Sequence, residues 1–96
     1  MKHRYHPDAR KELDDATDHY DRIDPQLGDD FLEEIEDCIS RIVRFPRAWT
    51  RLRGDVRRCR THRFPYSLIY QLEGERVYIL AVMHSSRKPN YWVERL

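Results

Sequence analysis

The sequence predicts a single α+β domain over residues 1–96 with the element order β-α-α-β-β-β, in which an antiparallel sheet carries an N-terminal helical hairpin on one face. Two patterns predict this class. In the first half of the chain, apolar residues recur every three or four positions, which is typical of amphipathic helices. In the second half, apolar and polar residues alternate, which is typical of half-buried strands. The length suits one domain.

The chain is expected to begin with a short strand followed by a helix. Residues 2–6, KHRYH, are predicted to form a strand at or near a sheet edge. Pro7 and Asp8 then begin a helix, because proline suits the first turn and an acidic side chain suits the positive end of the helix dipole. The apolar stripe of this helix comprises Ala9, Leu13, Ala16, Tyr20 and Ile23.

A second helix is expected directly after the first. Asp24 and Pro25 are a typical helix start, with an N-cap followed by proline at the first helical position. Gly28 costs roughly 1 kcal/mol inside a helix, so we expect the helix to begin nearer Asp29, and Pro46 ends it. The joint is short, so the two helices should lie side by side as a hairpin. The second stripe comprises Leu27, Phe31, Ile35, Cys38, Ile39 and Ile42.

The second half of the chain is expected to form the sheet. Residues 47–54 are predicted to be a loop, and residues 73–75, Glu-Gly-Glu, a tight hairpin turn. The tail over residues 89–96 is predicted to be a short helical turn or a loop. Three strands are expected, over residues 56–64, 66–72 and 76–84.

The charges are sharply divided along the chain, although the net charge is only +1. Residues 8–37 hold thirteen acidic and three basic residues, whereas residues 38–70 hold nine arginines and one aspartate. Arginine forms bidentate contacts with carboxylates and phosphates, so the second block suits an anionic partner. The alternative is that acidic helices and basic strands balance each other within the fold.

Other classes of protein are not indicated. Cys38 and Cys59 lack metal-binding or redox spacing and occupy apolar positions, which favours buried, reduced thiols. We therefore expect no metal and no cofactor. No segment approaches the roughly 20 apolar residues of a membrane span, and none resembles a signal peptide. The expected location is the cytoplasm, without a membrane partner.

Two stretches resemble the RelE/ParE superfamily of bacterial type II toxins. They are RLRGDVRRCRTHRFPYSLIYQL at residues 51–72 and ILAVMHSSRKPNYW at residues 79–92. With the helical hairpin, the resemblance extends over nearly the whole chain. It implies a small toxin whose surface is wrapped by a cognate antitoxin in a hetero-oligomer. It also implies one of two targets, since ParE-like members inhibit DNA gyrase and RelE-like members cut mRNA on the ribosome.

The RelE-like activity makes demands that this sequence meets only in part. Metal-free RNA cleavage needs a base, an acid and cations for the phosphorane charge. Threonine and serine can neither carry positive charge nor act as a base near neutral pH, and arginine is a poor base because it stays protonated. By the resemblance, the residues that serve RelE fall on Thr61, Arg63, Ser67, Arg87 and Tyr91.

Two histidines remain as candidate bases. Strand alternation would put His62 on the opposite face from Thr61 and Arg63. His84, at the end of the last predicted strand, can face a cleft with Arg87. If the chain is a nuclease, its expected site comprises Arg63, His84, Arg87 and Tyr91.

The ParE-like activity needs a binding surface instead of a catalytic site, and arginine and aromatic side chains dominate interfaces. We therefore predict an inhibitor of DNA gyrase, with the mRNA endonuclease as the alternative and an inactive antitoxin-binding module as a third possibility. A nucleic-acid-binding domain is less favoured, because no stacking platform or recognition helix accompanies the arginines. For Trp92, covering the core is an equal alternative to binding. The expected target-binding residues are Arg58, Arg60, Arg63, His84, Arg87, Tyr91 and Trp92.

Overall fold

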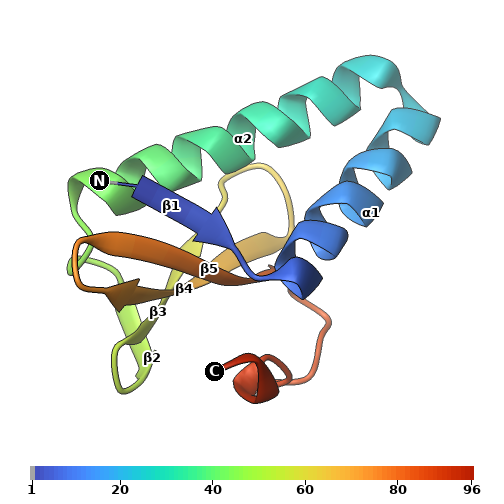
Figure 1. Ribbon diagram of the computed structural model, residues 1–96. Coiled ribbons are helices and arrows are strands. Elements are labelled where there is room, and N and C mark those ends of the chain that lie inside the picture. Colours follow the sequence, from blue (N-terminus) through green and yellow to red (C-terminus); the bar gives the residue numbers. More distant parts are fainter. Residues whose placement is uncertain (1) are drawn as a thin grey trace.

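The computed structural model describes residues 2–96, and its helices lie together on one face of a five-stranded sheet (Figure 1). The sheet order is β1-β5-β4-β3-β2. The predicted α+β class and the helical hairpin on one face are confirmed. The elements are β1 (Lys2–Tyr5), α1 (Pro7–Ile23), α2 (Pro25–Arg44), β2 (Thr50–Arg53), β3 (Val56–Arg60), β4 (Tyr66–Glu73), β5 (Arg76–His84) and the 3₁₀ turn η1 (Val93–Arg95).

The joint of the helical hairpin is one residue, Asp24. It ends α1 and caps α2, where its Oδ1 accepts a hydrogen bond of 2.9 Å from the Gln26 N–H. The expectation that α2 begins near Asp29 is wrong, because α2 begins at Pro25 and runs through Gly28. A Cβ at Gly28 would lie 1.6 Å from the Asp21 Oδ1 atom of α1. The glycine therefore allows the two helices to approach closely, which offsets its low helix propensity.

The sheet is antiparallel except at one edge, where β1 pairs in parallel with β5. The predicted edge position of the first strand is confirmed. The predicted third strand, 76–84, has the bounds of β5, and the predicted second strand extends one residue further as β4.

The segment predicted as a loop over residues 47–54 contains an additional strand, β2, and that prediction is wrong. β2 pairs with β3 through a turn at Gly54, whose φ of +53° suits glycine. All four residues of β2 are exposed at this outer edge. Because no residue of β2 is buried, the strand has no alternation of apolar and polar residues by which it could be recognised.

The predicted strand over residues 56–64 is too long, since β3 ends at Arg60. Beyond it the chain turns: the Thr61 N–H donates to the Tyr66 carbonyl at 3.0 Å, and the Thr61 hydroxyl donates to the Phe64 carbonyl at 2.8 Å. Pro65 has no N–H with which to continue a strand ladder. Strand alternation therefore does not decide where His62 and its neighbours point.

Apolar residues are buried on both faces of the sheet. Between the helices and the sheet, the largest buried side chains include Phe31, Ile35, Leu68 and Tyr70. The free thiols Cys38 and Cys59 are fully buried in the same layer, as predicted. A smaller core on the opposite face comprises Val56, Ile69, Leu80, Ala81 and Trp92.

The C-terminal tail forms the cover of this smaller core. It lies on the side of the sheet opposite the helices (Figure 1) and ends in η1, which confirms the predicted helical turn. None of the helices in residues 2–96 is both long and apolar enough to cross a membrane.

Candidate functional site

Glu12 of α1 holds the C-terminal tail in place. Its carboxylate accepts hydrogen bonds of 2.7 Å from the Tyr91 hydroxyl and 2.8 Å from Arg95 Nη1. It also accepts one of 3.1 Å from the Val82 N–H of β5. Burial raises the pKa of Tyr91, and so do its hydrogen bond to Glu12 and the negative charge of that carboxylate. The Tyr91 hydroxyl is therefore a structural donor rather than an acid poised for chemistry.

Trp92 belongs to the core and not to the surface. Its side chain is 1% exposed and packs with Ile69 and Leu80 on the sheet. Its prediction as a target-binding residue is therefore wrong, and the alternative of covering the core holds. The sequence could not show whether Trp92 is buried or exposed, because the tail has no regular spacing of apolar residues that would indicate which side chains face the core.

His84 and Arg87 line one cleft of about 230 Å³, as the sequence predicted for this pair. The His84 ring packs edge-on against Tyr66 at 5.1 Å between centroids. The Ser86 N–H donates to His84 Nδ1 at 3.0 Å, so a neutral His84 ring carries its proton on Nε2. The Arg87 guanidinium lies over the Tyr91 ring at 4.2 Å. A cation and an imidazole N–H therefore face the same opening.

The same cleft contains acidic groups that the sequence around Arg87 does not reveal. Helix α1 contributes Glu12 and Asp15 to its lining. The cleft is therefore of mixed charge, which does not suit a phosphate as well as a purely cationic site would.

Arg63 and His62 lie elsewhere, against α2. Both backbone N–H groups donate to the Glu34 carboxylate, while the Arg63 guanidinium is 3.4 Å from Asp30. His62 Nε2 is 2.9 Å from Arg41 Nη1. The two residues therefore share one neighbourhood, and their predicted placement on opposite faces of a strand is wrong.

Consequently, the four residues of the alternative nuclease site are gathered only in part, because Arg87 shares a cleft with His84 and lies over Tyr91, whereas Arg63 does not line that cleft. Arg63 is paired with α2, while His84 and Arg87 line the cleft beside α1. Tyr91 is engaged by Glu12. The residues 2–96 also contain no group of three or more His, Cys, Asp or Glu side chains that could hold a metal ion.

Thr61 and Ser67 are neutral, but neighbouring residues on the open face of the sheet are positively charged. Arg60 lies directly opposite Ser67 in the register of β3 and β4, and Arg58 lies opposite Ile69. Both arginines line a pocket of about 290 Å³. The Thr61 hydroxyl is used within the turn. The sequence analysis included both arginines among its target-binding residues, but it extended the strand beyond Arg60 to Arg63, which instead lies against α2.

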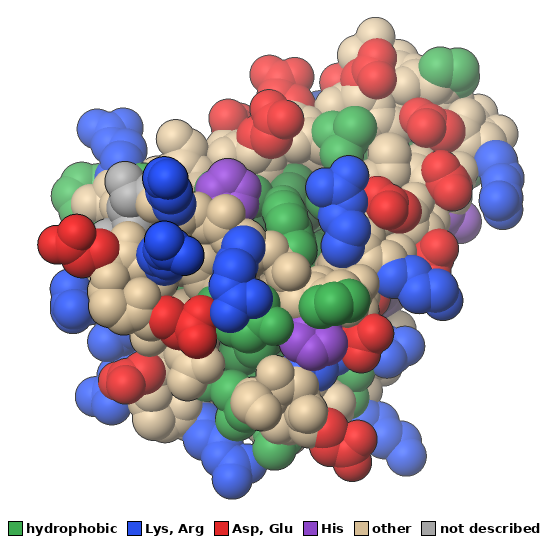
Figure 2. Space-filling view, viewed as in Figure 1, with side chains coloured by type: hydrophobic (Ala, Val, Ile, Leu, Met, Phe, Trp, Pro, Cys, Tyr) green, Lys and Arg blue, Asp and Glu red, His purple; other side chains and the backbone are tan. Residues whose placement is uncertain are grey.

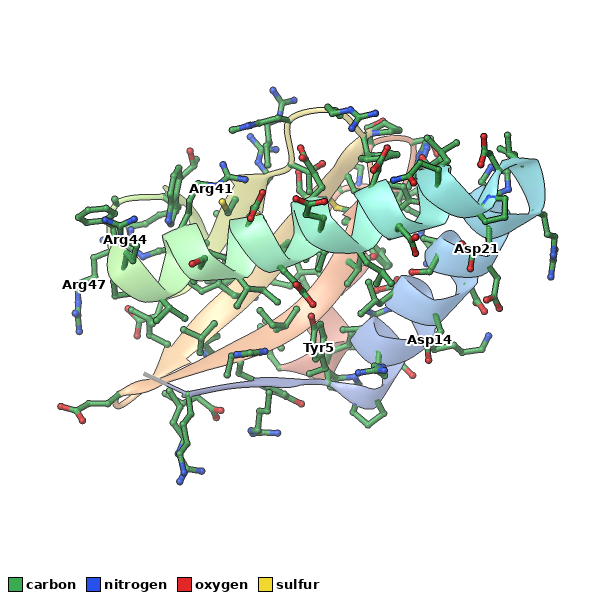
Figure 3. All side chains as sticks on the ribbon, turned by 90° about the horizontal axis from the view of Figure 1, so that it is seen from above. Tyr5, Asp14, Asp21, Arg41, Arg44 and Arg47 are labelled. Atoms are coloured by element: carbon green, nitrogen blue, oxygen red, sulfur yellow. The ribbon has the colours of Figure 1, made fainter. Side chains whose placement is uncertain are left out.

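A groove of about 590 Å³ lies between β1 and the two helices. Apolar side chains form its floor, and Arg10 and Arg44 stand at its rim. In Figure 2 hydrophobic side chains are visible in the middle of this face, between α2 and the sheet, with Lys and Arg around them. Figure 3 shows Tyr5 between β1 and α2. The apolar lining comprises Tyr5, Leu13, Leu32, Ile35, Ile39 and Val43.

Sequence reasoning missed this groove, although a signal exists. Leu32 and Val43 are apolar residues of α2 outside the stripe that faces the sheet, and Leu32 is 37% exposed. The apolar stripe of α2 is wider than packing against the sheet requires. The remaining apolar surface is therefore available to a binding partner.

Known proteins resemble this chain in sequence and in fold. The family model described as ParE toxin of type II toxin-antitoxin system, parDE, matches residues 3–89. No curated protein matches the chain. A solved structure, the chromosomal ParDE TA system from P. aeruginosa, is similar with a TM-score of 0.62 and 19% identity, over 88% of this chain and 95% of that one. At this identity the structural likeness supports the fold alone. Because the family model extends over most of the sequence, the chain belongs to the ParE toxin family of type II toxin–antitoxin systems.

Proposed function

We propose that this chain is a toxin that inhibits DNA gyrase by binding, and that a cognate antitoxin neutralises it by occupying the groove between β1 and the helices. The observation that carries the choice of target is that Arg63 pairs with Asp30 of α2 and does not line the cleft of His84 and Arg87. A nuclease must bring base, acid and cations to one phosphate. A gyrase inhibitor needs only a surface.

The groove supports the antitoxin part of the proposal. Its apolar floor can bury a row of side chains from an amphipathic segment, and β1 is an edge strand whose outer side is unpaired in residues 2–96. An extended segment can therefore add to the sheet beside β1 while its apolar side chains enter the groove. Arg10 and Arg44 outnumber the one acidic residue of the described lining, Glu36, and so favour a segment with acidic residues flanking the apolar ones.

The surface proposed to contact gyrase comprises exposed or half-buried cations that do not belong to this groove. Arg87 is exposed and lies in the tail, which Glu12 fixes against α1. Arg58 and Arg60 lie on the open face of the sheet. Because a rigid scaffold holds these side chains, they lose little conformational freedom on binding.

The ribosome-dependent mRNA endonuclease remains the second candidate, on one observation. His84, with an imidazole N–H, shares a cleft with Arg87. A nuclease built on this pair would have to work without Arg63 and in the presence of Asp15 in the same cleft.

Induction of the toxin without its antitoxin separates the two targets. The gyrase proposal predicts DNA damage signalling and cell filamentation while protein synthesis continues, and inhibition of purified gyrase by the purified chain. Immediate arrest of translation with cuts in ribosome-bound mRNA would instead establish the endonuclease. A His84→Ala variant should keep its gyrase inhibition in the first case and lose its mRNA cleavage in the second.

A variant in the groove tests the antitoxin part. Leu32→Ser removes an apolar contact from the floor of the groove without touching the core, because Leu32 is already 37% exposed. We expect at least tenfold weaker antitoxin binding and unchanged toxicity. The matched control is Leu52→Ser on β2, where the leucine is 38% exposed but lies outside the groove. Equal antitoxin affinity for both variants would place the antitoxin elsewhere.

A further inference from the structure

We propose that the open face of the sheet binds duplex DNA directly, with Arg58 and Arg60 of β3 holding neighbouring phosphates of the backbone. The toxin would then contact DNA by itself, through two arginines that belong to the surface proposed above for gyrase, so that this part of the surface holds DNA and the rest remains for the enzyme. This inference does not require that gyrase is the target, because DNA binding is measured without the enzyme.

The two arginines are arranged as a pair. They are two residues apart on one strand, so they project from the same face about 7 Å apart. Among residues 2–96, no hydrogen bond or ion pair engages either guanidinium. Arg57 on the opposite face differs, since its Nη1 donates to the carbonyls of Arg47 and Trp49 at 3.0 Å each. The Arg57 guanidinium is therefore engaged in the fold, whereas the N–H groups of Arg58 and Arg60 in the described chain remain available to a ligand.

The surroundings of the pair are complementary to an anion. The pocket of about 290 Å³ that both arginines line has no acidic residue in its lining. Ser67 and Ser85 add hydroxyl groups to the same lining. Guanidinium and hydroxyl groups are the side-chain donors that contact DNA phosphates in protein complexes. The cleft of His84 and Arg87 does not qualify, because Asp15 lies in it.

The acidic and basic blocks of the sequence lie mainly on different sides of the folded molecule. Helices α1 and α2, which hold most of the acidic residues of 8–37, lie on the opposite side of the sheet from the C-terminal tail and its small core, and only Asp8 and Glu12 among these described residues reach the tail through Arg95. A polyanion is therefore repelled by the helical side and attracted to the sheet side, which orients its approach.

The form of nucleic acid follows from the aromatic residues near the pocket. Tyr66 packs edge-on against Phe31 at 5.1 Å, and Phe64 packs against Tyr20 at 4.9 Å. Phe64 is only 8% exposed and Tyr66 is half-buried, so these rings leave little surface on which unpaired bases could stack, as single-strand recognition requires. Backbone recognition of a duplex needs neither a stacking platform nor a recognition helix. We therefore assign the site to duplex DNA without base specificity.

The test is fluorescence anisotropy of a labelled duplex of about 20 base pairs, titrated with the purified toxin over a series of salt concentrations. Each phosphate contact contributes about −0.9 to the slope of log affinity against log salt. The variant Arg58→Gln/Arg60→Gln should reduce the magnitude of that slope by about 2 and weaken binding at least tenfold at low salt. Arg58→Lys/Arg60→Lys, which keeps the charges, should retain most of the affinity.

The control is Lys11→Gln/Arg22→Gln, which removes the same charge from the exposed surface of α1 outside the groove and should leave the slope unchanged. Equal losses in both glutamine variants, tighter binding of single-stranded RNA than of duplex DNA, or no duplex binding by the wild type at about 50 mM salt would each overturn the proposal. Circular dichroism and the lysine variant show whether a loss reflects unfolding. If duplex binding behaves as expected while purified gyrase is not inhibited, only the gyrase proposal fails.

Discussion

The Tyr91 hydroxyl donates a hydrogen bond of 2.7 Å to the Glu12 carboxylate, 79 residues away in the chain. Arg95 donates to the same carboxylate and to the Leu80 carbonyl at 2.9 Å. One side chain of α1 thus fixes both ends of the tail, and Trp92 between them is held against the sheet. The tail cannot leave without exposing the small core.

The first prediction concerns this anchor. Glu12→Gln removes the charge that balances Arg95, whose side chain is only 12% exposed. Because the partly buried guanidinium then keeps, among residues 2–96, only the exposed Asp8 carboxylate, 3.8 Å away, as an ionic partner, we expect the free energy of unfolding to fall by about 2 kcal/mol. Tyr91→Phe, which loses one hydrogen bond, should cost about 1 kcal/mol. Urea unfolding measures both, and Glu33→Gln, on the exposed side of α2, should change little. If Glu12→Gln has the same free energy of unfolding as the wild type, the tail is held by packing alone.

The second prediction separates packing from function in the tail. Trp92→Ala should destabilise the domain by about 3–5 kcal/mol, because it empties a fully buried aromatic site. Arg87→Ala should change stability by less than about 0.5 kcal/mol, because Arg87 is exposed. Yet Arg87→Ala should reduce growth inhibition. Thermal unfolding and plating after induction give the two readouts, and undiminished toxicity of Arg87→Ala would remove Arg87 from the functional surface.

The difference between these tail residues illustrates what the sequence could and could not predict. Periodic segments were predicted well: both helices and β5 follow from the spacing of apolar residues, and β5 has its predicted bounds. β2 and the end of β3 were missed because their residues are exposed arginines or lie in a turn, where burial imposes no pattern. Candidate site residues depend on where side chains meet in space. The sequence gives no measure of the distance between Arg63 and His84.

The third prediction concerns the close approach of the helices. Gly28→Ala would bring a Cβ within 1.6 Å of the Asp21 Oδ1 atom and 2.5 Å of its Cγ. Because these atoms are the far end of an exposed side chain that can rotate away, we expect a loss of no more than about 1 kcal/mol, although alanine is the better helix former. In Asp21→Ala/Gly28→Ala both clashing atoms are gone, so most of the lost stability should return. A double-mutant cycle of urea unfolding tests this coupling, and additive effects would show that Asp21 is not the obstacle.

The fourth prediction concerns the salt dependence of antitoxin binding. Arg10 and Arg44 flank the proposed groove, so an acidic antitoxin segment should associate faster at low salt. Surface plasmon resonance should show an association rate that falls as salt rises, with less change in dissociation. Arg44→Gln should flatten that dependence, whereas Arg22→Gln at the far end of α1 should not. An affinity that is independent of salt would exclude the arginines as a docking surface.

The last prediction concerns pH and the loop that follows β3. Partial burial opposes ionisation of Glu34, but the backbone N–H groups of Arg63 and His62 donate to its carboxylate and lower its pKa below the ordinary value of 4.5. A lowered pKa in the folded state means that the unfolded chain binds the proton more tightly. Glu34 therefore contributes its full stability above about pH 4.5 and loses it as the pH falls through the lower, folded-state pKa.

Glu34→Gln should accordingly reduce the free energy of unfolding by about 1 kcal/mol at neutral pH, and the difference from the wild type should shrink as the pH falls below about 4.5. Urea unfolding at a series of pH values measures this difference. Glu33→Gln, on the neighbouring exposed position, should show no such dependence. If the difference in free energy of unfolding between the wild type and Glu34→Gln stays constant down to the lowest pH at which both fold, the Glu34 side chain acts through its shape and not through its charge.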